Sequence, residues 1–549
     1  MSSKKVAGVV VLVAAVLACA VSLTKRGRGS GDERRASRAA QARRAPVLFF
    51  TDITSGPSRG GRDDLGAFVS IYGDGFGERR GRSTVTIGGT RVARYVVWGE
   101  DNAVARGQDL IVIQPGPRAV SGEIVVTVDG RASNPLPFTI RSGRIHFVAP
   151  DAPNARDSNP GTWELPARTL HGRSRDLQPG DIVYVKGGRF EEADPRCPGW
   201  DAVLCIFPED HPSGTPGAPV AYVGYPGDPP VLGGPGPMRR AIILGDTMAH
   251  YVIAGMEFTH RGGLLEVHGE GHRIVGNYFH DGIHSNGGVI GVGGDTAHHA
   301  LFGNHLRDNG EAGDKMNGSG LYVQGFGVNL DIDFGWNQIE DQRGARAIQA
   351  YGHRDGDRIE DLRIHDNLIS GSELNNIVLG GSDGATPVLG TVHVFNNVIV
   401  GSGDSGLRIN DPEGAVIVEN NVLYDNGSPG LSGARAQLHV ERAGTGRVTL
   451  RNNILYAGSD QSYFLIGTEA GPSAISASHD LVFGAGGCPE WDVACVNADP
   501  LFADADALDF RLRAGSPAID AGVATEIHHD YVGNARPRGA AYDIGAIER

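Results

Sequence analysis

A five-residue motif recurs nine times between Val220 and Phe483, and it constrains the fold of this chain more than any other feature. Representative copies read Phe302-Gly-Asn-His-Leu306, His365-Asp-Asn-Leu-Ile369 and Phe395-Asn-Asn-Val-Ile399. The third positions of the nine copies are Met256, Asn277, Asn304, Asn337, Asn367, Asn397, Asn421, Asn453 and Asp480, spaced by 21 to 33 residues. Self-similarity at this period indicates stacked coils, and the varying intervals favour a β-solenoid over an α-helical repeat.

The repeated Asn predicts a ladder inside the solenoid. An Asn at the same turn of every coil can stack on its neighbours and hydrogen-bond along the stack, while the apolar residues around it enter a shared core. We therefore expect Asn277 to Asn453 to point inward or along the stack with paired amides. A second strand precedes each motif, as in Leu321-Tyr-Val-Gln324 and Ile348-Gln-Ala-Tyr351, with its second and fourth residues facing outward.

These repeats resemble the right-handed parallel β-helix family typified by the pectate lyases, over roughly residues 144 to 500. The resemblance implies an all-β chain, with a right-handed parallel β-helix and its N-terminal cap at 142–498. The segments Asp499-Pro-Leu-Phe502 and Gly515-Ser-Pro-Ala-Ile-Asp-Ala-Gly522 resemble the tail unit called the choice-of-anchor Q domain. We expect 499–549 to form a C-terminal cap, because an uncapped solenoid exposes apolar surface.

Residues 46–141 predict a separate immunoglobulin-like β-sandwich ahead of the solenoid. Short alternating strands such as Val69-Ser-Ile-Tyr72 and Ile124-Val-Val-Thr-Val128 are separated by Gly-rich turns. The run Gly73-Asp-Gly-Phe-Gly77 and the strand after it resemble the TIG (IPT) immunoglobulin-like domain. This resemblance implies a spacer or a binding module, and we expect a spacer.

The N-terminus predicts export. Lys4 and Lys5 precede an apolar run, so that residues 1–23 read as a signal sequence or a membrane anchor. Val16-Leu-Ala-Cys19 resembles the lipobox of bacterial lipoproteins, which implies lipid attachment at Cys19. Lipoprotein, uncleaved anchor and simple secretion all stay open. We expect residues 24–45 to form a basic, disordered tether that holds the protein on the outer surface or in the periplasm.

The five cysteines agree with export. Cys197 and Cys205 are close in sequence, as are Cys488 and Cys495, so that two local disulfides would leave Cys19 alone. Disulfides of this kind persist in oxidising compartments.

The charge distribution limits the partners. The chain carries a net charge of −14, and residues 1–45 carry +8, so the remainder carries −22. An acidic body argues against nucleic-acid binding, and a polyanion would need a focal basic patch. We expect a monomer that contacts the membrane through its N-terminus only and binds a polysaccharide or glycan.

One insertion supplies the first candidate site. Glu311-Ala-Gly-Asp-Lys315 lies in the longest interval of the ladder, and Lys315 is the only Lys after Lys186. A Lys can act as a base when it is desolvated, whereas an Arg stays protonated. Arg343, Arg346 and Arg354 follow one coil later and are candidates to neutralise an acidic sugar. The plainer interpretation is a solvated loop Lys and Arg side chains at turns.

The outward positions of the second strand supply the candidate substrate contacts. They are polar or aromatic, as sugar binding requires, although an exposed sheet face is polar in any case. The residues are Tyr322, Gln324, Gln349, Tyr351, Arg408, Asn410, His439 and Glu441.

Histidines form a third candidate group. His280 and His284 flank Asp281, and His298, His299 and His305 follow one coil on, which would suit a general base or a metal. Loop histidines without a role are the alternative.

The resemblance implies β-elimination on a uronic-acid polysaccharide. Lys315 would be the base, Arg346 the neutralising charge, and Glu311 and Asp314 possible Ca²⁺ ligands. Glycoside hydrolysis is an alternative that needs paired carboxylates, for which Asp383 and Asp411 are candidates. A non-catalytic glycan-binding or adhesive surface protein is the competing class.

Overall fold

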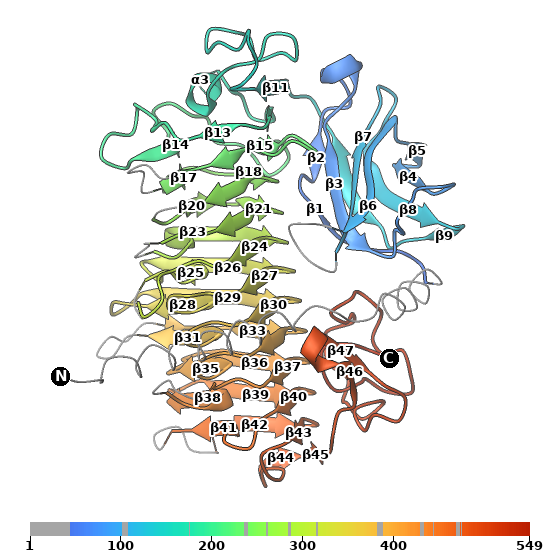
Figure 1. Cartoon of the computed structure of the whole chain (residues 1–549), viewed down its shortest axis with the longest axis vertical. Coiled ribbons are helices and arrows are strands. Elements are labelled where there is room, and N and C mark those ends of the chain that lie inside the picture. Colours follow the sequence, from blue (N-terminus) through green and yellow to red (C-terminus); the bar gives the residue numbers. More distant parts are fainter. Residues whose placement is uncertain are drawn as a thin grey trace, which may run out of the picture.

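The computed structural model describes residues 44–101, 108–174, 176–234, 240–259, 262–283, 287–314, 317–381, 388–428, 433–442, 444–467, 473 and 475–549. The expected signal sequence with Cys19, and nearly all of the tether, lie outside these residues. A β-sandwich stands beside the upper half of a long parallel β-helix (Figure 1). Within the described part of the chain, no helix is long and apolar enough to cross a membrane.

Each coil of the helix contributes a strand to each of three parallel rows, which we call rows A, B and C. Row A contains β11 (Ile145–Val148), β12 (Ile182–Val185), β15 (Val220–Gly224), β18 (Tyr251–Ala254), β21 (Arg273–Val275), the second half of β23 (Ile290–Phe302), β26 (Val328–Gly335), β29 (Arg358–His365), β32 (Val388–Leu389) with β33 (Val392–Phe395), β36 (Ala415–Glu419), β39 (Arg447–Arg451), β42 (Ile475–Ser478) and β44 (Asp492–Val493).

Row B contains β14 (Ala202–Ile206), β17 (Arg240–Leu244), β20 (Leu265–Glu270), the first half of β23, β25 (Leu321–Val323), β28 (Ile348–Gly352), β31 (Ile377–Gly381), β35 (Leu407–Asn410), β38 (Ala436–Arg442) and β41 (Ser462–Ile466). Row C contains β13 (Arg189–Phe190), β16 (Val231–Leu232), β19 (Glu257–Thr259), β22 (Tyr278–His280), β24 (His305–Arg307), β27 (Gln338–Glu340), β30 (Leu368–Ser370), β34 (Val398–Val400), β37 (Val422–Tyr424), β40 (Ile454–Tyr456), β43 (Leu481–Phe483) and β45 (Val496–Asn497).

The predicted right-handed parallel β-helix is confirmed. Side chains alternate across each strand, so that Leu321 and Val323 enter one continuous core with the inward residues of the other coils, whereas Tyr322 lies outside that core. Each strand bonds to the coil before and after it, which satisfies the backbone N–H and C=O groups of the inner coils.

The Asn ladder is also confirmed, at the turn from row A to row C. The Nδ2 atom of each Asn donates to the next side chain along the stack, over 2.9–3.1 Å from Asn277 through to Asp480. The same Nδ2 also donates to a carbonyl of the preceding coil, as Asn367 does to Phe334 at 2.9 Å. Hydrogen bonds to neighbouring side chains and to the backbone therefore offset the cost of burying these amides.

The N-terminal sandwich consists of two sheets. One has the order β1 (Val47–Thr51), β3 (Val69–Asp74), β7 (Asp109–Gln114) and β6 (Arg94–Asp101). The other has the order β2 (Ser55–Gly56), β10 (Leu136–Ile140), β8 (Gly122–Val128), β4 (Thr84–Ile87) and β5 (Thr90–Arg91), with β9 (Arg131–Ala132) on β8.

This sandwich is docked on the helix along row A. Its core runs without a break into the outward residues of row A, from Ile182 and Tyr184 to Val275. Tyr184 Oη accepts a hydrogen bond from the Phe68 amide at 2.7 Å, and Arg273 donates to the Thr51 carbonyl at 2.8 Å. Buried apolar contact of this kind holds two units in one orientation.

The two ends of the helix are closed differently. At the start, helix α3 (Leu170–Ser174) places Leu170 on the core, and the turn after it adds Leu177. At the other end, Trp491 packs against Phe464 and the core, within the loop that the Cys488–Cys495 disulfide closes. The second predicted disulfide, Cys197–Cys205, is present as well.

The region from 499 onward, which contains β46 (Phe502–Asp504), η3 (Ala505–Ala507) and β47 (Asp509–Leu512), lies along the side of the last coils (Figure 1). Its apolar residues pack on outward residues of row C, among them Val398, Val422 and Ile454. The apolar surface that needed cover is thus a flank of the helix, because these row C positions are apolar on both faces.

Candidate functional site

The outward side chains of row B form two columns that run along the helix, and we call this surface the row B face. Strand register places one residue of each coil in the first column, which reads Cys205, Ile243, Glu266, Gly291, Tyr322, Gln349, Val378, Arg408, His439 and Leu465. Gln324 and Tyr351 belong to the second column. Six of the eight predicted contacts, Tyr322, Gln324, Gln349, Tyr351, Arg408 and His439, therefore share one face, on the side of the helix away from the sandwich (Figure 1).

Arg346 lies on this face, just ahead of β28, and its positive charge is compensated only at longer range, by the carboxylate of Asp404. Its guanidinium donates to the Gln349 side chain at 3.3 Å, and its Nε is buried without a partner. It forms no ion pair with any residue in the described part of the chain. Burial, and next the positive charge of Arg408, lower the pKa of Arg346. A half-buried guanidinium without a carboxylate is a binding position for an anion.

A phenol and an imidazole meet beside Arg346. The Tyr322 hydroxyl is hydrogen-bonded to His353 Nε2, and the His353 ring stacks on Phe326 with centroids 5.2 Å apart. Burial raises the pKa of Tyr322 and lowers the pKa of His353, so that both groups are neutral at neutral pH. The pair can pass a proton between a ligand and solvent.

His353 was missed by the sequence analysis. It follows the outward strand Ile348–Gly352 directly, next to the candidate Arg354. This position, directly after an outward strand and next to Arg354, was the feature of the sequence that could have pointed to His353. Its pairing with Tyr322 of the preceding coil depends on the register between coils, which the sequence does not reveal.

The lower part of the row B face carries a neutralised pair. Arg408 binds Glu441 through Nε at 3.1 Å, which leaves little net charge there. His439 lies beside them, and burial followed by the positive Arg408 lowers its pKa. Arg408 and His439 can contact a ligand through hydrogen bonds, while Arg346 is left as the focal cation.

Lys315 lies outside the described residues, but the segment before it is placed. The Asp314 carbonyl accepts a hydrogen bond from the Ala345 amide at 3.1 Å, next to Arg346 in sequence. The insertion therefore reaches the edge of the row B face.

The proposed Ca²⁺ ligands fit a metal poorly. Both carboxylate oxygens of Asp314 accept hydrogen bonds from Asn317, at 3.2 and 2.9 Å. Glu311 is exposed. In the described part of the chain, no group of three or more His, Cys, Asp or Glu side chains is arranged so that it could hold a metal ion.

The other candidates do not converge with Arg346. Arg343 is exposed and pairs with Asp308 at 2.7 Å, and Arg354 lies over the Phe326 ring. Asp411 lies 3.7 Å from Arg442, and Asp383 lies outside the described residues, so no carboxylate pair for hydrolysis is established.

The predicted histidine site is not assembled. His280 and His305 both flank Tyr278 on row C, whereas His298 and His299 occupy the turn from row B to row A. His299 is buried against His272, with parallel rings 5.2 Å apart. His284 lies outside the described residues. These side chains serve the packing of two different edges.

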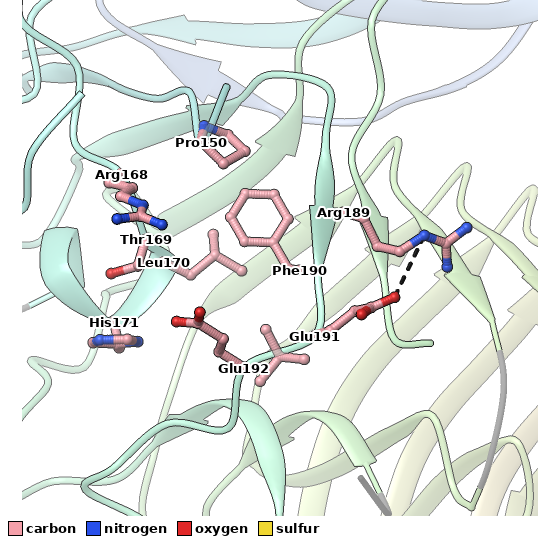
Figure 2. Close-up of a pocket in the computed structure, with 10 residues that line it drawn as sticks. Pro150, Arg168, Thr169, Leu170, His171, Arg189, Phe190, Glu191 and Glu192 are labelled. Atoms are coloured by element: carbon pink, nitrogen blue, oxygen red, sulfur yellow. Dashed lines mark ion pairs between the residues drawn. The ribbon is translucent and has the colours of Figure 1, made fainter. Parts of the chain in front are cut away.

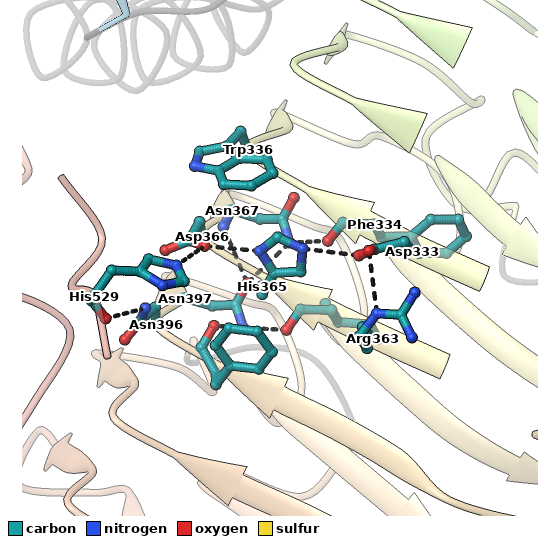
Figure 3. Close-up of polar contacts among 12 residues, drawn as sticks. Asp333, Phe334, Trp336, Arg363, His365, Asp366, Asn367, Asn396, Asn397 and His529 are labelled. Carbon is teal, nitrogen blue, oxygen red and sulfur yellow. Dashed lines mark hydrogen bonds and ion pairs between the residues drawn. The ribbon is translucent and has the colours of Figure 1, made fainter. Parts of the chain in front are cut away.

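A different histidine cluster is buried on row A. His365 lies between Asp333 and Asp366, at 2.8 and 2.7 Å, and Asp366 also binds His529 of the C-terminal region at 3.1 Å (Figure 3). At the edge of the cluster, Arg363 Nε donates a hydrogen bond to Asp333 at 3.1 Å. All of these groups are paired with one another, and they connect two parts of the fold.

A pocket of about 260 Å³ lies apart from the row B face, at the N-terminal cap (Figure 2). Phe190 and Leu170 line it, and Arg189 and Glu191 approach to 3.7 Å at its edge. It contains none of the residues that the sequence analysis singled out.

The sequence of the sandwich matches the profile of the IPT/TIG domain over residues 49–140. Residues 49–140 form an IPT/TIG domain. A comparison of the whole sequence with curated proteins gave no significant match. The IPT/TIG domain thus identifies the docked unit and leaves the helix to be interpreted from its own residues.

Several solved structures are similar to the chain. A pectate lyase (Pel9A) is 17% identical, with a TM-score of 0.39, over 74% of this chain and 96% of that one. An alginate lyase from Paenibacillus sp. is 17% identical, with a TM-score of 0.32, over 60% and 95%. A lacto-N-biosidase from Eubacterium ramulus is 12% identical, with a TM-score of 0.38, over 64% and 68%. Because these identities and TM-scores are low, the similarity says nothing about the activity of this chain.

Proposed function

We propose that this chain binds a polysaccharide along the row B face and cleaves it by β-elimination at a uronic acid residue. The observation that carries the proposal is the guanidinium of Arg346, which is half-buried near Tyr322, Gln349 and Arg408 and forms no ion pair with a described residue. A uronic acid carboxylate supplies the missing negative charge through paired N–H···O hydrogen bonds. The acidic body of the chain leaves this position as a focal cation.

The chemistry divides between three side chains. Arg346 neutralises the carboxylate, which acidifies the proton at C5, and Lys315 acts as the base that removes this proton. The electron pair forms the C4–C5 double bond, the bond from C4 to the leaving oxygen breaks, and that oxygen takes a proton. We assign this donation to the Tyr322 hydroxyl, which its raised pKa keeps protonated and which is bound to His353.

The decisive experiment is an absorbance assay for the unsaturated product, with a panel of uronic-acid polysaccharides. We expect Arg346→Ala to lower product formation about 100-fold and Tyr322→Phe to do so by a similar factor. Lys315→Ala should abolish it without lowering the melting temperature. Arg343→Ala is the matched control, because Arg343 is an exposed Arg of the same coil that pairs with Asp308.

The outcomes separate the competing classes. Full activity of Arg346→Ala or Lys315→Ala would contradict the assigned roles. Arg346-dependent binding without any product would identify a non-catalytic glycan-binding protein, and products without a double bond would identify a hydrolase. The role of Glu311 and Asp314 as a Ca²⁺ pair is tested by the same assay with EDTA, and undiminished activity would reject it.

We further propose that the chain is exported and held at the cell surface through its N-terminus, on the basis of residues 1–45. Lipid attachment at Cys19 predicts that Cys19→Ala leaves the membrane fraction. A variant that stays with the membrane would favour an uncleaved anchor.

A further inference from the structure

Trp200 lies beside the start of the row B face, and its side chain is available to a ligand. It precedes β14, and 45% of its surface is exposed. In the described part of the chain, it is the only aromatic residue among the exposed large apolar side chains. Single exposed apolar side chains are common on protein surfaces, so the neighbours of Trp200 decide what it can do.

The indole is also held in place. The guanidinium of Arg240 lies over its ring, 5.2 Å from the centroid. Arg240 Nε is fixed in turn by Glu266 at 3.1 Å, and the Cys197–Cys205 disulfide ties the preceding loop to β14. With one ring face covered and its support fixed, the rest of the indole forms a platform that loses little conformational freedom on binding.

Strand register connects this platform with Arg346. The column that begins at Cys205, beside Trp200, reaches Gln349, beside Arg346, after five coil steps. At a strand spacing of about 4.8 Å, the two positions are about 24 Å apart along the helix. A polysaccharide that lies along the row B face therefore contacts both, several sugar rings apart.

The charges along this path indicate what kind of sugar each position accepts. Glu266 is neutralised by Arg240 at 3.1 Å, and Glu441 is neutralised by Arg408 at 3.1 Å. Arg346 is the buried guanidinium on this described path that has no carboxylate partner. A polymer with a carboxylate on every ring would find an unpaired cation only at Arg346 among these groups, so its other carboxylates would lose water without gaining an ion pair.

We infer that the substrate is a heteropolysaccharide in which a uronic acid stands between neutral sugars, and that Trp200 stacks on a neutral ring several units from the uronic acid at Arg346. This inference rests on the proposed function. The apolar face of a neutral sugar presents C–H groups to the negative face of the indole, which favours stacking. Trp200 then determines the length and composition of the chain that binds.

The test compares binding of gellan, whose repeat has a single glucuronate among neutral sugars, with binding of polygalacturonate, by titration calorimetry. We expect gellan to bind more tightly, Trp200→Ala to weaken its binding about tenfold, and Trp200→Phe to restore part of the loss. The matched control is Leu165→Ala, because Leu165 is also 45% exposed but lies in the N-terminal cap.

The outcomes distinguish the two proposals. If Trp200→Ala binds gellan as the wild type does while Arg346→Ala does not, the Trp200 subsite is rejected and the proposed function stands. If polygalacturonate binds as tightly as gellan, the heteropolysaccharide inference is rejected. If Arg346→Ala changes neither binding nor cleavage, the proposed function itself fails.

Discussion

Buried polar side chains of this chain avoid the cost of burial in two ways. The ladder amides each find a partner above, below and on the backbone, so they remain neutral and fully bonded. His365 is instead a buried cation held between two carboxylates. Its own burial lowers its pKa, but the hydrogen bonds with Asp333 and Asp366 outweigh that effect and raise the pKa to about 9.

The ladder makes a prediction at the scale of single residues. Asn367 Oδ1 accepts from both the backbone N–H and the Nδ2 of Asn337, at 2.8 and 3.0 Å, so Asn367→Leu leaves these donors buried without that acceptor. We expect a loss of about 3–6 kcal/mol in the free energy of unfolding, measured by denaturant titration. Asn497→Leu, the same change at an exposed position, should cost far less. Equal effects would mean that the ladder contributes nothing specific.

Periodicity along the chain made the ladder and the outward positions predictable, because both depend on spacing within one coil. Tyr322 and Gln349 were predicted to face outward from alternation alone, and both lie outside the core of the helix, although neighbouring side chains bury them. The unpaired state of Arg346 and the partner of Tyr322 were not predictable. They depend on which residues of neighbouring coils come side by side, and loops of varying length hide that register from the sequence.

At the scale of elements, one column of the repeat determines what docks on the helix. The residue before each ladder Asn has a positive φ in every coil, from Gly276 and Gly303 to Asp366 and Asn396. In the early coils this residue is Gly, and the rings of Tyr72 and Phe50 fill the space that a side chain would occupy. In later coils Asp366 and Asn396 bind the C-terminal region through His529. The change from Gly to Asp and Asn was visible in the sequence, but its distant partners were not.

This column predicts how to release the IPT/TIG domain. A Cβ atom at residue 303 would lie 2.4 Å from the Phe50 ring, while Trp336, with φ of 55°, shows that the backbone accepts a side chain at the equivalent position. We expect Gly303→Asn to undock the domain and to open the 141–144 linker to protease, with the helix still folded. Gly255→Asn is the control, because its Cβ would meet no atom closer than 3.8 Å. Equal cleavage of both variants would show that Phe50 does not set the docking.

For the whole molecule, the two flanking units leave one face of the helix to a ligand. The IPT/TIG domain covers the early part of row A, and the C-terminal region covers the apolar part of row C. Row B lies on the opposite side (Figure 1). The columns of row B mix apolar positions such as Ile243 and Val378 with polar ones such as Gln349. They lie beside Arg346 and Trp200, which is consistent with a polymer that lies along the helix axis.

The His365 cluster predicts that alkaline pH loosens the attachment of the C-terminal region (Figure 3). The folded pKa of His365, about 9, exceeds the unfolded value of about 6.5, so its stabilisation is complete below pH 6.5 and is lost as pH rises through 9. This shift corresponds to about 3 kcal/mol. Deprotonation would leave Asp333 and Asp366 without their shared cation, and Asp366 is the group that binds His529.

We therefore expect the melting temperature to fall between pH 7 and 9.5, together with faster proteolytic release of 499–549. His365→Gln should be less stable at pH 7 but nearly insensitive over this interval, whereas His171→Gln, a change in the cap helix, should keep the wild-type profile. An unchanged pH profile in His365→Gln would show that another group is responsible.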